Sequence, residues 1–380
     1  MKYNFDELIE RRGTGCVKWD ESLNDVIPLW VADMDFSVAP AILEAIRQRA
    51  KHPVFGYTFV QDDYYESVIS WFKRRHGWTI QREWMLYTTG VVPAMSCVIK
   101  ALTMPGEKVL ILSPDYNCFF SSIRNNGCEV LENQLARKNN SFEIDWNDFE
   151  IKCADEKTTV FLLCNPHNPT GRVWTKEELE QMRDICHQHH VRIISDEIHC
   201  ELIMPGYHFC PMGNVDSEAI ILNSPSKSFN IAGLQIANII CQDAEIRRRI
   251  DRAININEVC DVNPFAPEAV KAAYNESEEW IDELNQYLWQ NYQILNLFFS
   301  EELPQCKVCK LEGTYLVWID VSALGIPVEQ LCERLLNKGK VWVNPGTMYG
   351  TESGMGYIRI NIACPRNRLI EGLKRIKATI

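Results

Sequence analysis

The most regular feature of the chain is a series of continuous apolar runs, separated by amphipathic helical patterns, that begins near residue 85. The runs are "KVLILSPDY", "TTVFLLCNP", "VRIISDEIH", "AIILNSPSK" and "IANIICQD". Unbroken Val, Ile and Leu, rather than strict alternation with polar residues, are typical of strands covered on both faces. The pattern therefore predicts an α/β protein with a mostly parallel central sheet.

The segment "TKEELEQMRDICHQHH" is the clearest helix between two of these runs. Thr175 stands at the N-cap and Glu178 at the position that completes a capping box. The apolar residues Leu179, Met182 and Ile185 fall on one face of the expected helix. Strand, helix and strand together form a β-α-β unit.

The pattern changes after about residue 275. A long helical segment, "EEWIDELNQYLWQNYQILNLFFSEEL", leads into a few strands and a final helix, "PRNRLIEGLKRIKATI". A chain of 380 residues also exceeds the usual size of one domain. We expect a large domain over residues 46–275 and a smaller α+β domain over 276–380, joined by part of the N-terminal segment 1–45.

Composition and charge narrow the classes of partner. The 51 acidic and 39 basic residues give a formal net charge of -12, which opposes binding to nucleic-acid phosphates. The N-terminus, "MKYNFDELIERRGTG", is charged from its start, and no run of 18 apolar residues occurs. We therefore expect no signal peptide, no membrane span and a cytoplasmic location.

The 15 cysteines are an odd number and are scattered, which favours reduced thiols over a disulfide framework. Cys306 and Cys309 form a CxxC that suits a redox pair or half a zinc site, but no second CxxC follows, so chance spacing is favoured. The cluster "CHQHH" at residues 186–190 closes a polar helix, where solvated histidines are ordinary. A metal site there is the less favoured interpretation.

Three residues whose side chains can take part in binding or catalysis follow consecutive predicted strands: Asn165, Asp196 and Lys227. Both separations are 31 residues, the length of one strand, its crossover and the return strand. Right-handed crossovers bring all three to the carboxyl edge of one sheet, where open α/β folds bind ligands. A site is therefore predicted at this edge.

A lysine, a buried carboxylate and an amide meet the needs of pyridoxal phosphate. Lys227 provides the amine for its aldehyde, Asp196 the carboxylate for its ring nitrogen, and Asn165 a donor for its ring oxygen. The residue types alone leave a buried Lys–Asp ion pair open as the alternative.

The phosphate of that cofactor needs an anion cradle. In "TTGVVPAMSCVIKAL" a glycine opens a helix, so the backbone amides of Gly90, Val91 and Val92 can meet a phosphate at the positive end of the helix dipole. No "GK[ST]" follows, which argues against a P-loop. The hydroxyls of Ser224 and Ser226, close to Lys227 in the chain, could complete the hydrogen bonds.

These motifs resemble a known family. "NPHNPTG", "SDEIH" and "SPSKSFNIAG" are similar to the asparagine, aspartate and lysine motifs of fold-type-I pyridoxal-phosphate enzymes of the class I/II aminotransferase superfamily. "IPLWVADMDF", "FGYT", "TTGVVPA" and "YIRINIACPR" most resemble the MalY/PatB branch of cystathionine β-lyases. The resemblance covers nearly the whole chain and implies cleavage of carbon–sulfur bonds.

The resemblance also implies roles for further residues. It assigns Tyr116 to stacking on the pyridine ring, Tyr57 to the site of the neighbouring subunit, and Arg359 to the substrate carboxylate. A guanidinium suits that last task because it can hold a carboxylate by two parallel hydrogen bonds. Two positions depart from the wider pattern: His199 replaces a tyrosine beside the cofactor, and Gln235 replaces an arginine that pairs with the phosphate.

The resemblance therefore implies a homodimeric pyridoxal-phosphate enzyme with shared active sites. Its substrate would be L-cystathionine or a cysteine S-conjugate, and Lys227 would hold the cofactor and take the α-proton. An aminotransferase with the same site remains open, as does a regulatory protein that uses the fold as an interaction surface.

Overall fold

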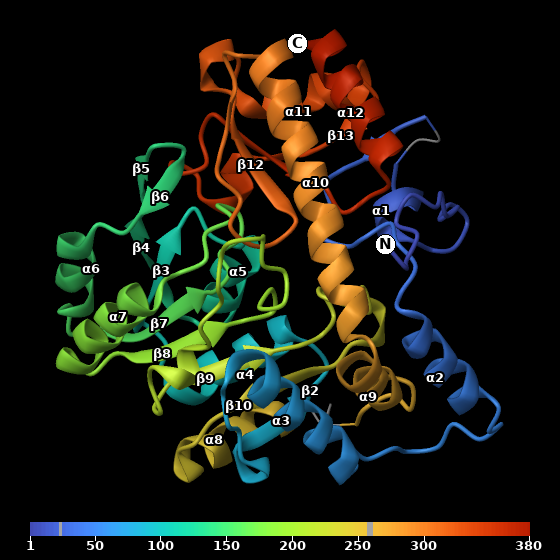
Figure 1. Cartoon of the computed structure of the whole chain (residues 1–380). Coiled ribbons are helices and arrows are strands. Elements are labelled where there is room, and N and C mark those ends of the chain that lie inside the picture. The colour runs from blue at the N-terminus through green and yellow to red at the C-terminus, as the bar shows by residue number, and fades with distance from the viewer. Residues whose placement is uncertain (23–24, 257–260) are drawn as a thin grey trace.

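The computed structural model describes residues 1–22, 25–256 and 261–380. A large sheet lies in the lower part of Figure 1, and a smaller one that contains β12 lies above it. The large sheet has seven strands, in the order β2 (Met85–Thr88), β10 (Ala237–Ile240), β9 (Ile220–Asn223), β8 (Arg192–Asp196), β7 (Thr158–Cys164), β3 (Lys108–Ser113) and β4 (Glu129–Gln134).

The large sheet is parallel from β9 through β8, β7 and β3 to β4, which confirms the predicted mostly parallel sheet. The exception is β10, which is antiparallel to both β9 and β2. Residues 224–236 connect β9 to β10 and contain no α-helix that would carry the chain back across the sheet. This connection, which includes Lys227, therefore stays at the edge where β9 ends.

Both faces of the large sheet are covered by helices, which explains its continuous apolar runs. In β7, Val160 and Leu162 pack in one apolar cluster, while Phe161 and Leu163 pack in the other. Successive side chains of a strand point to opposite faces, so each face needs its own apolar set. One cluster includes α4 (Val91–Leu102), α5 (Asn117–Asn125) and α8 (Ala244–Asn255), and the other includes α6 (Trp146–Cys153) and α7 (Lys176–Gln188).

The predicted capping box of α7 is present. The Thr175 side chain accepts from the backbone of Glu178, and the Glu178 side chain accepts from the backbone of Thr175. The buried face of the helix is formed by Leu179, Met182 and Cys186. Ile185, which the pattern placed on that face, is only partly buried.

The smaller sheet is antiparallel and has the order β11 (Lys307–Val308), β12 (Leu316–Asp320), β15 (Tyr357–Asn361) and β14 (Asn344–Pro345). The predicted long helix is α10 (Glu278–Glu302), and the predicted final helix is α12 (Arg366–Thr379). In Figure 1, α10 rises from beside α9 (Ala266–Glu276) to the small sheet, near α11 (Val328–Asn337).

The N-terminal segment joins the C-terminal part of the chain. Strand β1 (Ile27–Pro28) pairs in parallel with β13 (Val341–Trp342). Helix α1 (Val17–Asp20) precedes β1, and α2 (Pro40–Ala50) and α3 (Asp62–His76) follow it. Strands β5 (Ala136–Lys138) and β6 (Ser141–Glu143) form a separate two-stranded antiparallel sheet. The domain boundaries at residues 45 and 275 stay predictions.

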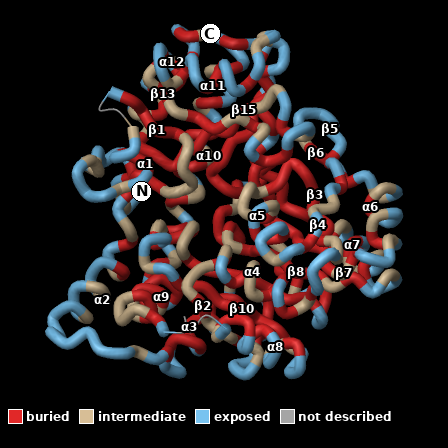
Figure 2. Tube along the Cα trace, turned by 180° about the vertical axis from the view of Figure 1, so that it is seen from behind, coloured by how far each residue is buried: buried red, intermediate tan, exposed pale blue. Residues whose placement is uncertain are grey.

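The connection between α2 and α3 is exposed over most of its length, as its pale-blue tube in Figure 2 shows. In the described part of the chain, no helix is long and apolar enough to cross a membrane.

The 14 cysteines within the described ranges are all free, as expected for reduced thiols. Cys306 and Cys309 are buried, and Cys186 faces the core from α7. Neither the CxxC nor residues 186–190 form a group of possible metal ligands among the described side chains.

Candidate active site

A cavity of about 190 Å³ lies where β7 and β8 end. Eight residues that the sequence predicted for the site line its wall, and these are Gly90, Val91, Val92, Tyr116, Asp196, His199, Ser226 and Lys227. They come from distant parts of the chain and meet because each ends or follows a strand that finishes at this edge. The cavity is therefore the predicted site.

Lys227 points its amine at the N-terminal segment. Its Nζ donates a hydrogen bond of 2.7 Å to the carbonyl oxygen of Ala32. Burial of the amine lowers the pKa of Lys227. The carboxylates of Asp33 and Asp196 oppose this shift, and the guanidinium of Arg359 adds to it. A lysine with a lowered pKa holds more of its amine in the neutral form, which is the form that attacks carbonyl groups.

Asp196 ends β8 and is 3% exposed. Burial raises the pKa of Asp196 to about 7, and the nearby Asp115 adds to the shift. The backbone N–H of Ile198, which donates to Oδ1 at 3.1 Å, and the charge of Lys227 act in the opposite direction. Such a carboxyl is suited to a cationic partner, because an adjacent positive charge stabilises its ionised form.

His199 is a neutral ring on the cavity wall. Burial lowers the pKa of His199 to about 3, and the positive charges of Lys227 and Arg359 add to this effect. Its ring lies 5.9 Å from that of Tyr315. Its Nδ1 is buried and has no hydrogen-bond partner in the described part of the structure. This nitrogen is therefore available to a bound molecule.

Residues 30–34 run past the cavity without forming a helix or strand, and side chains from the small sheet hold their carbonyl groups. Arg359 donates from Nη2 to the carbonyl of Trp30 at 2.8 Å. Asn361 donates from Nδ2 to the carbonyls of Val31 and Asp33. The 30–34 segment is thus fixed through its backbone.

The carbonyl of Ala32, in the middle of this segment, accepts two hydrogen bonds. One comes from Lys227, and the other comes at 2.9 Å from the hydroxyl of Tyr315, a fully buried residue. Sequence reasoning missed both Ala32 and Tyr315. A backbone acceptor has no residue-type signature, and the only signal was the motif "IPLWVADMDF" that contains it.

Arg359 is a buried cation next to the cavity, 3% exposed. Its Nη1 donates at 3.1 Å to Oδ1 of Asn168, and its guanidinium lies 4.6 Å from the ring of Tyr349. Across the described residues, no carboxylate forms an ion pair with it. A buried guanidinium without a carboxylate partner is suited to binding an anionic ligand.

The amide on the cavity wall belongs to Asn168, not to the predicted Asn165. The backbone N–H of Asn165 extends the pairing of β7 with β8 by donating to Asp196, and its Nδ2 donates to the carbonyl of Cys210 at 3.2 Å. The prediction placed the amide at the strand end, whereas the chain presents the second asparagine of "NPHNPTG" three residues later.

Ser224 is also displaced from its predicted role. Its Oγ donates to the carbonyl of Ile236 at 2.6 Å and accepts from the backbone N–H of Ser226. The hydroxyl therefore joins the two ends of the connection between β9 and β10, and only Ser226 reaches the cavity wall.

The start of α4, where the sequence predicted an anion cradle, lines the cavity. Gly90 precedes the helix with a φ of 156°, a conformation that residues with side chains rarely adopt. The first N–H groups of a helix have no partner within the helix, so those of Val91 and Val92 are free of intrahelical bonds at the wall. Gln235 does not line the cavity, and among the described wall residues Lys227 is the one lysine or arginine.

Tyr57 does not reach this cavity within one chain. It lies in the connection between α2 and α3 and is 98% exposed. The site as one chain forms it therefore contains no contribution from this tyrosine.

The comparisons with known proteins agree with this architecture. Residues 24–376 match the family described as aminotransferase class I and II. The chain is 40% identical to cystathionine β-lyase PatB of Bacillus subtilis, over 99% of this chain and 100% of that protein. It is 34% identical to protein MalY of Escherichia coli, over 98% of this chain and 97% of that protein.

One similar solved structure contains bound pyridoxal phosphate. The pyridoxal-phosphate-bound C–S lyase from Staphylococcus hominis superimposes with a TM-score of 0.93 and 34% identity, covering 99% of this chain and 98% of that one. The fold is that of the fold-type-I pyridoxal-phosphate enzymes. The chain belongs to the aminotransferase class I and II family.

The raised pKa of Asp196 generates a prediction for the cofactor-free protein. The unfolded chain loses this proton near pH 4 and the folded chain near pH 7, so ionisation of Asp196 destabilises the fold as pH rises through that window. About 2.5 pH units of this window lie between pH 4.5 and pH 7, and at about 1.36 kcal/mol each they amount to about 3 kcal/mol. We therefore expect the melting temperature of Asp196→Asn to exceed that of wild type by about 4 °C more at pH 8 than at pH 4.5.

A matched control is Glu197→Gln, at the neighbouring buried carboxyl. Burial raises the pKa of Glu197 to about 8. The melting-temperature difference between Glu197→Gln and wild type should therefore keep growing up to about pH 8, whereas that of Asp196→Asn levels off near pH 7. Melting followed by circular dichroism between pH 4.5 and 9 tests both variants. A difference between Asp196→Asn and wild type that stays constant across this range would contradict the account.

Proposed function

We propose that this protein is a pyridoxal-phosphate-dependent carbon–sulfur β-lyase that cleaves L-cystathionine or cysteine S-conjugates to pyruvate, ammonia and a thiol. The observation that carries the proposal is 40% identity over 99% of the chain to a protein named cystathionine β-lyase. The C–S lyase of the same fold, at 34% identity, supports it. The cavity supplies the residues that this chemistry requires.

The residues fit the cofactor. The cavity wall presents free N–H groups at the start of α4 and an unpartnered Nδ1 of His199, and both are polar groups that a bound molecule could satisfy. Asp196 would face the ring nitrogen, Tyr116 the ring itself, and Ser226 with the Gly90 turn the phosphate. With Gln235 off the wall, backbone amides carry more of the phosphate binding.

When bound, pyridoxal phosphate supplies an aldehyde that bonds to amino groups and a ring that withdraws electrons from the substrate's α-carbon. Lys227 would provide the amine for that aldehyde, and its Nζ, when not bonded to the cofactor, would accept the α-proton of the substrate. The hydrogen bond from Nζ of Lys227 to the carbonyl of Ala32 would fix the position of the free amine. The lowered pKa of Lys227 increases the fraction of this amine that is neutral.

Arg359 and Asn168 would hold the substrate α-carboxylate. They already contact each other at 3.1 Å, and Arg359 has no carboxylate partner in the described structure. Binding a carboxylate there would neutralise a buried cation and fix which bond of the α-carbon faces Lys227.

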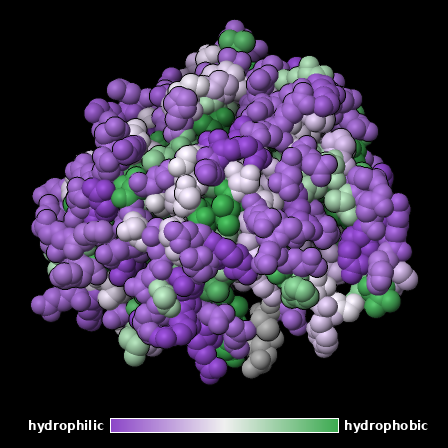
Figure 3. Space-filling model, turned by 60° about the horizontal axis from the view of Figure 1, so that its bottom comes forward, coloured by the Kyte–Doolittle hydropathy of each residue, from purple (hydrophilic) through white to green (hydrophobic). Residues whose placement is uncertain are grey.

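The exposed connection between α2 and α3 suggests how the site is completed. Its apolar residues Val54, Phe55, Tyr57 and Phe59 are each more than half exposed. Figure 3 shows apolar side chains in separate patches on an otherwise hydrophilic face. Exposed apolar residues on an extended segment suit a subunit contact, so the proposal includes a homodimer in which Tyr57 reaches the partner's cavity. A cytoplasmic location also belongs to this proposal.

We expect L-cystathionine to yield pyruvate, ammonia and homocysteine without consumption of a 2-oxo acid. After the α-proton leaves, the electron pair can expel the group on the β-carbon. A thiol with a pKa of about 8.5 leaves more readily than hydroxide, whose parent water has a pKa of about 15.7, so L-serine should react at least about 100-fold more slowly.

Pyruvate formation is followed in a coupled assay, in parallel with amino transfer to an added 2-oxo acid. Efficient amino transfer with negligible pyruvate would contradict the lyase proposal and would identify an aminotransferase.

Mixed dimers test the shared site. Lys227→Ala and Tyr57→Ala chains should each be nearly inactive, but a dimer of the two contains one intact site. Random 1:1 exchange makes about half of all dimers mixed, so up to about a quarter of wild-type pyruvate formation should return.

The matched control mixes Lys227→Ala with Arg359→Ala, two changes in the cavity of a single chain. No mixed dimer then has an intact site, and no recovery is expected. Equal activity in the two mixtures, with mixed dimers verified by differential tags, would show that Tyr57 does not serve the partner's cavity.

A further inference from the structure

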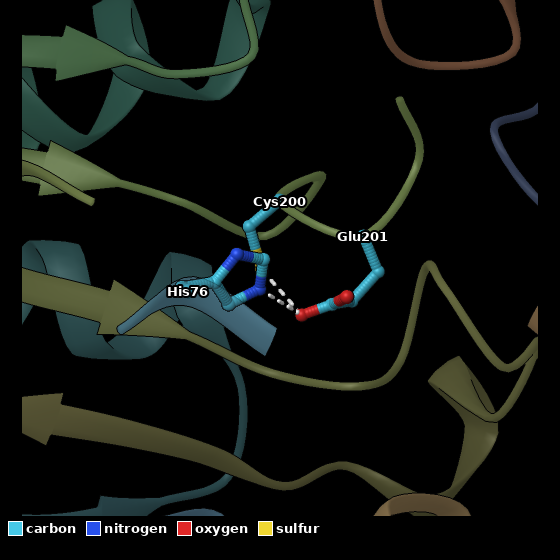
Figure 4. Close-up of side chains that lie close together, drawn as sticks. All are labelled: His76, Cys200 and Glu201. Carbon is cyan, nitrogen blue, oxygen red and sulfur yellow. Dashed lines mark hydrogen bonds and ion pairs between the residues drawn. The ribbon is translucent and has the colours of Figure 1, made fainter. Parts of the chain in front are cut away.

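A second group of reactive side chains lies away from the cavity at the strand ends. His76 is the last residue of α3, and Cys200 and Glu201 lie in the turn after β8. Figure 4 shows the three side chains converging. One possible ligand atom from each lies within 4.8 Å of the other two, and no other group of three meets this criterion in the described ranges.

The distances are close to those of a tetrahedral zinc site. Sγ of Cys200 lies 3.7 Å from Oε1 of Glu201. Zinc bonds of about 2.3 Å to sulfur and about 2.1 Å to oxygen place these atoms about 3.6 Å apart. Nε2 of His76 is 2.6 Å from the same oxygen, because the two share a hydrogen. An ion in place of that hydrogen would separate them by about 0.8 Å more.

The carboxylate of Glu201 is held in place and is not fully satisfied. Cys200 and Glu201 are each 3% exposed. The indole N–H of Trp71 donates to Oε1 of Glu201 at 2.7 Å. The other oxygen, Oε2, is buried and accepts no hydrogen bond from the described residues; Nε of Arg75 lies 3.7 Å from it, beyond hydrogen-bond distance. A buried oxygen without a hydrogen bond has capacity for a further ligand.

Access and charge also suit a divalent ion. The three residues line a second, open cavity of about 600 Å³, from which water can reach them. The nearest cation, Arg75, lies 3.7 Å from Oε2 of Glu201, but it also pairs with Glu278 and Asp282 at 3.2 Å and 2.8 Å. A thiolate and a carboxylate carry two negative charges, which one divalent ion neutralises.

We propose that His76, Cys200 and Glu201 bind one Zn²⁺, with a water molecule from the adjoining cavity as the fourth ligand. The ion bonds to the imidazole Nε2, the thiolate Sγ and a carboxylate oxygen. The thiol proton passes to solvent, and the His76–Glu201 hydrogen bond is broken. A set of one nitrogen, one sulfur and one oxygen favours zinc over magnesium or calcium, which prefer oxygen ligands.

The position of this site connects it to the cavity at the strand ends. The ion would tie the end of α3 to the turn after β8. His199, which lines that cavity, directly precedes Cys200 in this turn. Zinc is therefore expected to stabilise the turn that carries His199, and to raise the melting temperature of the holoenzyme.

The test uses full-length holoenzyme that has been treated with a chelator and dialysed. Titration with Co²⁺ should give a near-ultraviolet thiolate-to-cobalt absorption band that saturates at one equivalent per chain, and Zn²⁺ should abolish it. Cys200→Ser should lose the band and bind Zn²⁺ at least 10-fold more weakly, as measured by calorimetry. His76→Gln should also weaken Zn²⁺ binding at least 10-fold.

Two variants control for other binding. Cys186→Ser changes a buried thiol of α7 outside the group, and His208→Gln changes an exposed histidine of the same cavity. Both should keep the band and the affinity of wild type. The proposal is overturned if wild type gives no band at one equivalent, or if His76→Gln binds Zn²⁺ as tightly as wild type. Tight Zn²⁺ binding by His76→Gln would overturn the proposal even if Cys200→Ser fails to fold.

Discussion

The active site depends on one constraint: an amine and a carboxyl group share a cavity wall where little water can solvate their charges. Lys227 and Asp196 each respond by a shift of pKa toward the neutral form. The charged groups near Lys227 and Asp196 then determine what fraction of each side chain is ionised. The chain places them together because β8 ends at the cavity and the connection from β9 to β10 never leaves the same edge.

The hydrogen bond from Lys227 to the carbonyl of Ala32 extends this constraint to the other end of the chain. The 30–34 segment pairs with no strand of the described structure, and side chains from the small sheet hold its carbonyl groups. Just beyond it, Asp35 is buried among three cations, Arg11, Lys18 and Arg368, at 2.7–3.2 Å. Removing the carboxylate of Asp35 would leave the fully buried Lys18 with only Asp33 at 3.5 Å, and loss of a partner from a buried ion pair costs about 3–5 kcal/mol. The N-terminal segment is thus joined to α12 by the ion pair between Asp35 and Arg368, and to Lys227 by the carbonyl of Ala32.

The sequence predicted the fold class because its signals are local and repeated. Apolar runs of strand length and the capping box at Thr175 are both present in the structure. The strands themselves end at Cys164, Asp196 and Asn223, so the constant spacing of 31 residues belongs to the predicted site residues and not to the strand ends. It did not specify the direction of β10, because an apolar run does not reveal strand direction. The direction of a strand follows from the connection that precedes it, and the connection to β10 lacks an α-helix.

The site was predicted less completely, because side-chain direction and backbone acceptors leave little trace in residue types. Asn165 and Asn168 are both asparagines of one motif, and only the fold decides that Asn168 faces the cavity. The carbonyl of Ala32 and the hydroxyl of Tyr315 meet Lys227 from segments far apart in the sequence. His76 and Glu201 are 125 residues apart, and no spacing rule connects them.

Lys227, and no other lysine, is expected to bond the cofactor in this cavity. Reducing the yellow holoenzyme with borohydride fixes the cofactor to its lysine, and digestion with mass spectrometry then locates the modified peptide. The account predicts one modified site per chain, on the peptide that contains "NSPSKSFN". A cofactor attached to a different lysine would contradict it.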